Sequence, residues 1–156
     1  MIRFVGHLIA PGDVRRRRVR LGRAAVTAHP GPATNRIEVI RSRMGDVPWP
    51  DRDLRVTAVD VDSGEFRVFT RESGVSLVEA VAASCAVPLV WPPVEIGGHR
   101  YMDGGVRSST NADQAAGCDP VVVIAPLPKS MTKAGSIGVQ LGRAGARRTA
   151  VVTPDQ

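Results

Sequence analysis

The residue best suited to chemistry is Asp103, which ends a predicted strand and is followed by Gly104 and Gly105. Glycines on its C-terminal side let the backbone bend sharply and let other groups approach closely. A carboxylate held at such a point suits a general base. Aspartate also starts many turns, and Asp-Gly by itself is a common turn pair. Residue spacing alone therefore leaves both interpretations open.

A second arrangement would combine Ser84 or Cys85 with His99 and Asp103 as a nucleophile–base triad. Ser84 and Cys85, however, lie near the end of a predicted buried helix, just before Pro88, where a packing role is expected. His99 follows two glycines, and we expect its side chain to be exposed at a hairpin. The triad is therefore the weaker of the two catalytic hypotheses.

Metal and disulfide chemistry have little support. Asp60 and Asp62 could together bind a cation, but acidic residues are common where a strand enters a turn. Cys85 and Cys118 are the only cysteines, and neither belongs to a C-x-x-C pair. We expect small apolar thiols in a reducing compartment, with no metal, no disulfide scaffold and no cofactor.

Basic charge is concentrated at the start of the chain. The net charge is +6, and residues 1–50 hold ten arginines against three acidic residues. The run Arg15, Arg16, Arg17 and Arg18 suits an anionic membrane surface, with a solvated helix face as the alternative. We expect no nucleic-acid binding, because no aromatic residues interleave the arginines.

Length and composition favour an ordinary globular protein. The chain has 156 residues, about one domain, and 43% of them are apolar. No stretch approaches the ~20 apolar residues that cross a bilayer. In a secretory signal the positive charge precedes the apolar part, whereas here the arginine cluster follows it. We therefore predict a cytoplasmic protein, peripheral to the membrane if the arginines bind lipid.

The chain reads as two segments, a basic helical segment over 1–50 and the remainder over 51–156. A basic helix is predicted over Val14–Ala28, and a second from a cap at Asn35 to about Met44. Pro48, Trp49 and Pro50 then make a rigid connector.

Local signals become sharper after residue 53. Leu54–Asp60 and Glu65–Thr70 alternate apolar and polar residues, which predicts a hairpin through Asp62-Ser63-Gly64. Ser76 and Glu79 form a capping box that opens a helix to about Cys85.

The remaining signals indicate strands alternating with helices. Val94–Ile96 and the residues from His99 flank Gly97-Gly98, the signature of a tight hairpin. Val121–Ala125 is continuously apolar, which predicts a strand buried on both faces. The other expected elements are a short helix over Asn111–Ala116, a helix over Ser136–Ala144 and a strand over Thr149–Val152. This alternation predicts an α/β fold with a largely parallel central sheet.

Several of these segments together resemble the patatin-like phospholipase family. Ala83-Ser84-Cys85-Ala86-Val87-Pro88 is similar to the family's A-S-x-A-x-P helix end, and Asp103-Gly104-Gly105 is similar to its D-G-G/A motif. The similar stretches, in order, are Leu54–Glu65, Ala82–Pro93, Gly97–Val106, Asn111–Ala125 and, more weakly, Leu141–Asp155.

The resemblance implies a three-layer domain that hydrolyses fatty-acyl esters or phospholipids with a Ser–Asp dyad. Asp103 would accept the proton of the serine, and Gly104 and Gly105 would shape the turn. The family's serine stands in G-x-S-x-G, a nucleophile elbow between a strand and a helix. Trp91 is expected to pack beside prolines, or else to line an acyl-chain cleft.

The sequence departs from the family pattern at the nucleophile. None of its nine serines lies in G-x-S-x-G, and Ser136, the nearest, has Ala134 for the first glycine. We expect Ser136 to be a loop or helix-cap residue. The chain is therefore expected to be the C-terminal part of a patatin-like domain, inactive alone, with an N-terminal half that supplies the serine. The competing hypothesis is a non-catalytic interaction or membrane-surface fragment.

Overall fold

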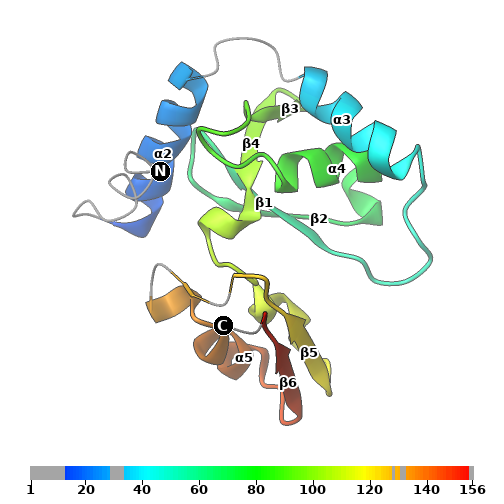
Figure 1. Ribbon diagram of the computed structural model, residues 1–156, viewed down its shortest axis with the longest axis vertical. Helices are drawn as coiled ribbons and strands as arrows, with labels where there is room; N and C mark the ends of the chain where they lie inside the picture. The colour runs from blue at the N-terminus through cyan, green and yellow to red at the C-terminus, as the bar shows by residue number, and fades with distance from the viewer. Residues whose placement is uncertain (1–12, 29–33, 128, 131–132, 155–156) are drawn as a thin grey trace. The chain divides into compact units, whose positions relative to one another are not determined.

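The structure, a computed structural model, describes residues 13–28, 34–127, 129–130 and 133–154 (Figure 1). The chain divides into two compact units, Met1–Gly104 and Gly105–Gln156.

The first unit is built on a four-stranded antiparallel sheet. Its strands have the order β2-β1-β4-β3, and every neighbouring pair is antiparallel. The bounds are β1 (Val56–Asp60), β2 (Phe66–Phe69), β3 (Val94–Ile96) and β4 (His99–Asp103). Both predicted hairpins are confirmed. Gly97 and Gly98, with φ of 58° and 77°, supply the left-handed turn that joins β3 to β4.

The prediction of a largely parallel central sheet is wrong for the described residues. Tight turns join β1 to β2 and β3 to β4, and a connection that short permits only antiparallel pairing. The connection from β2 to β3 does carry a helix, but β4 rather than β3 pairs with β1. The fold is mixed α/β, and among the described strands the one parallel pair lies in the second unit.

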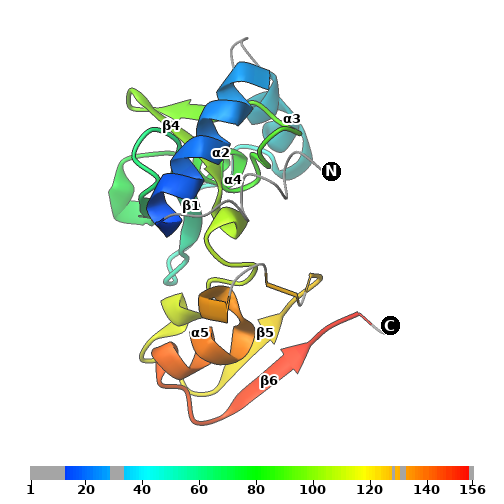
Figure 2. The ribbon, with the colours of Figure 1, turned by 90° about the vertical axis from the view of Figure 1, so that its left-hand side faces the viewer.

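Helices cover both faces of the first sheet. Helix α4 (Leu77–Ser84) packs on β1, β3 and β4, with α3 (Thr34–Met44) against its outer side (Figure 1). Helix α2 (Val14–Ala28) lies on the opposite face (Figure 2). A Cβ atom at Gly22 of α2 would lie 2.8 Å from the carbonyl oxygen of Val61, so this helix approaches the chain after β1 very closely. The first unit is thus a three-layer arrangement of α2, sheet, and α4 with α3.

The starts of two of these helices agree with the predictions made from the sequence. The Ser76 Oγ accepts a hydrogen bond from the Glu79 N–H at 3.2 Å, and the Glu79 carboxylate accepts one from the Ser76 N–H at 2.9 Å. The predicted capping box is therefore confirmed. The arginine-rich helix begins and ends where the sequence predicts, with Leu21 and Ala25 completely buried. Helix α3 begins at Thr34, so the predicted cap residue Asn35 lies within the helix; its side chain lies outside the described residues.

The second unit has a smaller, parallel sheet. Strands β5 (Val121–Ile124) and β6 (Thr149–Val152) pair in parallel, connected through α5 (Ile137–Ala144). The residues Val121, Val123 and Leu141 belong to a small apolar core. The predicted helix over 111–116 is a 3-10 turn, Ala112–Ala115, and three other short 3-10 turns are Arg71–Ser73, Gly104–Val106 and Lys133–Gly135.

The prediction that Val121–Ala125 is buried on both faces is wrong within this unit. Burial alternates along β5, and the side chains of Val122 and Ile124 are 63% and 74% exposed. The reason is that α5 and the turn Ala112–Ala115 cover one face of the two-stranded sheet only.

Candidate active site

Asp103 stands at the end of β4, where this strand contacts both β1 and the segment that follows α4. It lies opposite Ala58 of β1, and its backbone N–H donates a hydrogen bond to the Ala86 carbonyl at 3.0 Å. Ala86 follows the end of α4 by two residues. The residue is half-buried. The end of the strand is therefore tied both to the neighbouring strand and to the segment that leaves α4.

Gly104 has a steric reason to be glycine. A Cβ atom at this position would lie 2.5 Å from the Thr57 carbonyl oxygen and 2.8 Å from its carbonyl carbon. Both atoms belong to the backbone of β1, which cannot move aside without breaking the sheet. The absence of a side chain at Gly104 thus lets the chain after Asp103 turn directly against β1.

Cys85, the C-cap residue that follows α4, is electrostatically coupled to Asp103. Burial raises the pKa of its thiol, and the negative charge of Asp103 raises it further. The charge of Arg36 and a hydrogen bond from it act in the opposite direction. The raised pKa leaves little reactive thiolate at neutral pH, which disfavours Cys85 as a nucleophile.

Arg36 is a neighbour that the sequence analysis did not single out. It lies on α3 and is only 6% exposed. The signal that could have found it is its spacing: Arg36 precedes Ile40 by four residues and so belongs to the apolar stripe of the helix rather than its solvated face.

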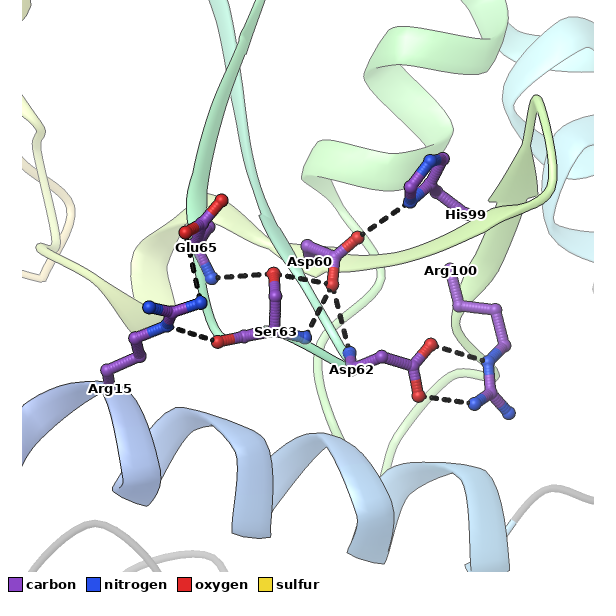
Figure 3. Close-up of polar contacts among 7 residues, drawn as sticks. All are labelled: Arg15, Asp60, Asp62, Ser63, Glu65, His99 and Arg100. Atoms are coloured by element: carbon purple, nitrogen blue, oxygen red, sulfur yellow. Dashed lines mark hydrogen bonds and ion pairs between the residues drawn. The ribbon is translucent and has the colours of Figure 1, made fainter.

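His99 lies away from Asp103. It begins β4 and Asp103 ends it, so the two are about 13 Å apart along the strand. Figure 3 shows the His99 ring facing Asp60, with Nδ1 at 3.3 Å from a carboxylate oxygen. The triad of Ser84 or Cys85, His99 and Asp103 is therefore not assembled.

Asp60 organises the turn between β1 and β2. One of its carboxylate oxygens accepts hydrogen bonds from the Ser63 N–H at 2.7 Å, the Ser63 hydroxyl at 2.8 Å and the Asp62 N–H at 3.0 Å (Figure 3). Burial by itself raises the pKa of Asp60. The hydrogen bonds from Ser63, His99 and Asp62 outweigh that effect and bring the pKa below its ordinary value. These contacts give Asp60 a structural role.

Asp62, the second residue considered as a cation ligand, forms an ion pair with Arg100. Both Asp62 carboxylate oxygens accept hydrogen bonds from Arg100, at 2.6 and 3.2 Å. In the part of the chain that the structure describes, no three His, Cys, Asp or Glu side chains gather as potential metal ligands. The pairing of Asp60 and Asp62 is thus explained by the turn and by ion pairing.

The arginine run is divided between structural contacts and solvent. Arg15 pairs with Glu65 at 3.0 Å and donates to the Ser63 carbonyl at 2.7 Å (Figure 3). Arg18 donates to the Gly64 carbonyl at 3.4 Å. Arg16 and Arg23 are exposed. The run therefore serves in part to hold α2 against the turn between β1 and β2.

Neither serine that was considered as a nucleophile occupies an exposed elbow between a strand and a helix. Ser84 is the half-buried last residue of α4. Ser136 is the N-cap residue of α5, and its hydroxyl donates to the Lys133 carbonyl at 2.8 Å. Ser136 was expected to be a loop or helix-cap residue, and it does occupy the N-cap position, although its side chain makes no capping hydrogen bond. Within the described ranges, no helix combines the length and apolar character needed to cross a bilayer.

The family model of patatin-like phospholipase matches residues 3–116, about three quarters of the chain. The chain therefore belongs to the patatin-like phospholipase family. The matched region contains Asp103-Gly104-Gly105. Membership indicates lipid acyl hydrolase activity, with lipids as the class of substrate. No curated protein matches the chain.

Proposed function

We propose that this chain is the base-bearing part of a lipid acyl hydrolase of the phospholipase or esterase type, in which Asp103 is the proton acceptor of a Ser–Asp dyad. The observation that carries the proposal is the placement of Asp103 at the end of β4, immediately before a glycine that must pack against the Thr57 backbone. This arrangement fixes the backbone on both sides of the carboxylate.

The serine partner is proposed to come from a segment outside these 156 residues. None of the nine serines of the sequence lies in G-x-S-x-G. The complementing segment, the missing N-terminal half in the family's order, would contribute both the serine and the oxyanion donors. Gly104 and Gly105 would shape the turn that brings Asp103 to the hydroxyl.

In the proposed reaction the Asp103 carboxylate takes the proton from the serine hydroxyl as its oxygen attacks the acyl carbonyl carbon. The tetrahedral intermediate collapses to an acyl-enzyme, and Asp103 returns the proton to the alcohol oxygen as the alcohol leaves. Water then attacks the acyl-enzyme and releases the fatty acid. An aspartate has an ordinary pKa near ~3.9, so its position must compensate for weak basicity. Half-burial and the hydrogen bond from the Asp103 N–H to the Ala86 carbonyl favour such a fixed position.

The test uses this chain alone and together with the serine-bearing segment of a family member. Alone, it should neither hydrolyse p-nitrophenyl esters nor react with a fluorophosphonate probe. In the combined protein, Asp103→Asn should lower kcat by roughly 10²–10⁴-fold, because asparagine keeps the shape but cannot take a proton. Asp51→Asn is the matched control, since the Asp51 side chain is 99% exposed. An Asp103→Asn protein with unchanged kcat would remove Asp103 from the mechanism.

A second candidate function is binding of α2 to an anionic membrane surface. It is favoured by the exposure of Arg16 and Arg23 and weakened by the engagement of Arg15 and Arg18 with the β1–β2 turn. The double change Arg16→Glu with Arg23→Glu should reduce cosedimentation with phosphatidylserine vesicles if this function holds. Equal vesicle binding by the parent protein and the double variant would exclude these arginines as the lipid contact.

A further inference from the structure

Arg36 is a buried cation that forms no ion pair with any carboxylate of the described residues. Its Nη2 donates to the Cys85 carbonyl at 3.0 Å, and its guanidinium carbon lies 4.3 Å from the centre of the Trp91 ring. Its Nε is buried and has no hydrogen-bond partner among the described residues. Removing a guanidinium from water is costly, so a residue kept in this position calls for a reason.

The first contact places Arg36 at the C-terminus of a helix. Cys85 is the C-cap residue of α4, and the last carbonyls of a helix lack partners within it. Arg36 supplies one of these partners from α3, and a cation at this end also interacts favourably with the helix dipole. The guanidinium also stacks on the Trp91 ring, which restrains its plane. Arg36 thus joins the start and the end of the segment between α4 and β3.

The next carbonyl along the chain leads to the proposed base. The carbonyl of Cys85 accepts from Arg36, and that of Ala86 accepts from the Asp103 N–H at 3.0 Å. Two consecutive peptide groups therefore connect α3 to the end of β4. Peptide planes are stiff, so fixing one carbonyl restricts the orientation of its neighbour.

The electrostatics agree with this geometry. The pKa of the Cys85 thiol depends on both charges. Burial is the largest cause that raises this pKa, the Asp103 charge raises it further, and the Arg36 charge lowers it. The opposite charges of Arg36 and Asp103 therefore act on one thiol from separate elements, α3 and β4.

We propose that Arg36 is a positioning residue for Asp103, acting through the Cys85–Ala86 backbone to hold the carboxylate end of β4 where a serine can meet it. The inference rests on the proposed function for its catalytic meaning. The proposal adds Arg36, which lies outside the D-G-G motif, to the site and explains why its guanidinium is kept buried.

The experiment uses Cys85 as a reporter in the full chain. Cys118 is exposed and is first changed to serine, so that Cys85 is the only thiol. The rate of alkylation by iodoacetamide is then measured against pH for the parent, Asp103→Asn, Arg36→Met and the double variant. Asp103→Asn should speed alkylation at pH 8 by about threefold or more, because removal of the anion favours the thiolate. Arg36→Met should slow it at the same pH.

The double variant distinguishes positioning from simple packing. If Arg36 holds Asp103 in place, Asp103→Asn should have a much smaller effect in the Arg36→Met background than in the parent. The quantity compared is the ratio of the alkylation rate with Asp103→Asn to the rate without it. If Arg36 only fills space, the two substitutions should act independently, and this ratio should be the same in the parent and in the Arg36→Met background. Equal ratios would overturn the proposal. Arg41→Met is the matched control on α3, where Arg41 forms surface ion pairs with Glu38 and Asp46, and it should leave the ratio unchanged.

Arg36→Lys guards against a failure of Arg36→Met to fold. Lysine keeps the charge, but a single ammonium cannot both bind the Cys85 carbonyl and stack flat on Trp91. The Asp103→Asn ratio should therefore fall partway in the Lys background, and a ratio equal to that of the parent would again overturn the proposal.

Activity supplies the catalytic half of the test. In the combined protein that carries the serine, Arg36→Met should lower kcat by roughly tenfold or more, with KM nearly unchanged, because positioning acts on the transition state. An unchanged kcat, in a protein that loses activity on Asp103→Asn, would overturn the proposal. If the combined protein with intact Asp103 is inactive, the proposed function fails, whereas the alkylation ratios still decide whether Arg36 positions Asp103.

Discussion

The two units of this protein bury their sheets in different ways. In the first unit, β1–β4 lie between α2 on one face and α4 on the other, and side chains such as Val59 and Phe69 are 0% and 1% exposed. In the second unit, β5 and β6 have one covered face, and Ile124 on the other is 74% exposed. The first unit combines two hairpins with helices on both faces of its sheet, whereas the parallel pair of the second unit is joined by a crossover and covered on one face only.

We expect stability and function to reside mainly in the first unit. The proposed base, Asp103, and the proposed positioning residue, Arg36, both belong to the unit with the complete core. The second unit presents an apolar strand face, on which Val122 and Ile124 are exposed. We therefore expect changes in the two units to have separable effects, and the following predictions test that separation.

The largest effect is expected from the core of the first unit. Phe69 packs edge-on against Tyr101, with ring centres 5.1 Å apart. Phe69→Ala should lower the free energy of unfolding by about 3–5 kcal/mol, because it removes buried area and leaves a cavity. Hydrogen exchange should show the loss in the amides of β1 and β4. Leu127→Ala, at a side chain 76% exposed, is the control and should change little. Protection lost equally in β5 would show that the units unfold together.

The largest effect in the second unit is expected from its partly buried ion pair. The Arg107 and Asp113 side chains are 17% and 13% exposed, and Arg107 Nη1 donates to Asp113 at 2.8 Å. The Arg107 hydrogen bond is the main cause that lowers the pKa of Asp113. Arg107→Met should therefore cost about 2–3 kcal/mol by leaving a carboxylate unpaired. Exchange should accelerate in α5 and β5. If it accelerates as much in β1, the proposed separation is wrong.

A smaller effect is expected at the turn of the first sheet. The Asp60 pKa is lowered in the folded protein, so the ionised carboxylate stabilises the fold above its ordinary pKa. That contribution is complete above about pH 4 and is lost as the pH falls through the lowered folded value. Asp60→Asn should cost about 1–2 kcal/mol at pH 7. Thermal melts from pH 7 to pH 2.5 should show the gap between the two proteins closing in acid. A gap that stays constant with pH would contradict this account of Asp60.

The smallest effect on stability is expected at the exposed face of β5. Ile124→Thr should change the free energy of unfolding by no more than about 0.5 kcal/mol, since little buried area is lost. It should nevertheless raise soluble yield, because an apolar strand with an open face promotes association. Val123→Thr, on the covered face, is the matched comparison: Val123 is 7% exposed, and this change should destabilise the second unit clearly. Equal destabilisation by the two changes would show that the Ile124 face is covered in solution.

Much of the local structure could be predicted from the sequence. The helix Val14–Ala28, the Ser76–Glu79 capping box and the two hairpins all depend on residues within a few positions of one another. For the candidate site, the sequence indicated Asp103 and its glycines through their motif, and the structure adds the steric reason for Gly104. Arg36 was missed because its partners, Cys85 and Trp91, are about fifty residues away in the chain.

Residue type and short-range spacing were thus enough to predict most of the helices and strands, the two hairpin turns, the Ser76–Glu79 capping box and the family. The pairing of β4 rather than β3 with β1, the exposed face of β5 and the reach of the Arg36 guanidinium to the end of α4 are visible only in the folded structure. Strand order and side-chain burial depend on which distant segments meet. An apolar run such as Val121–Ala125 has the same composition whether one face or both are covered.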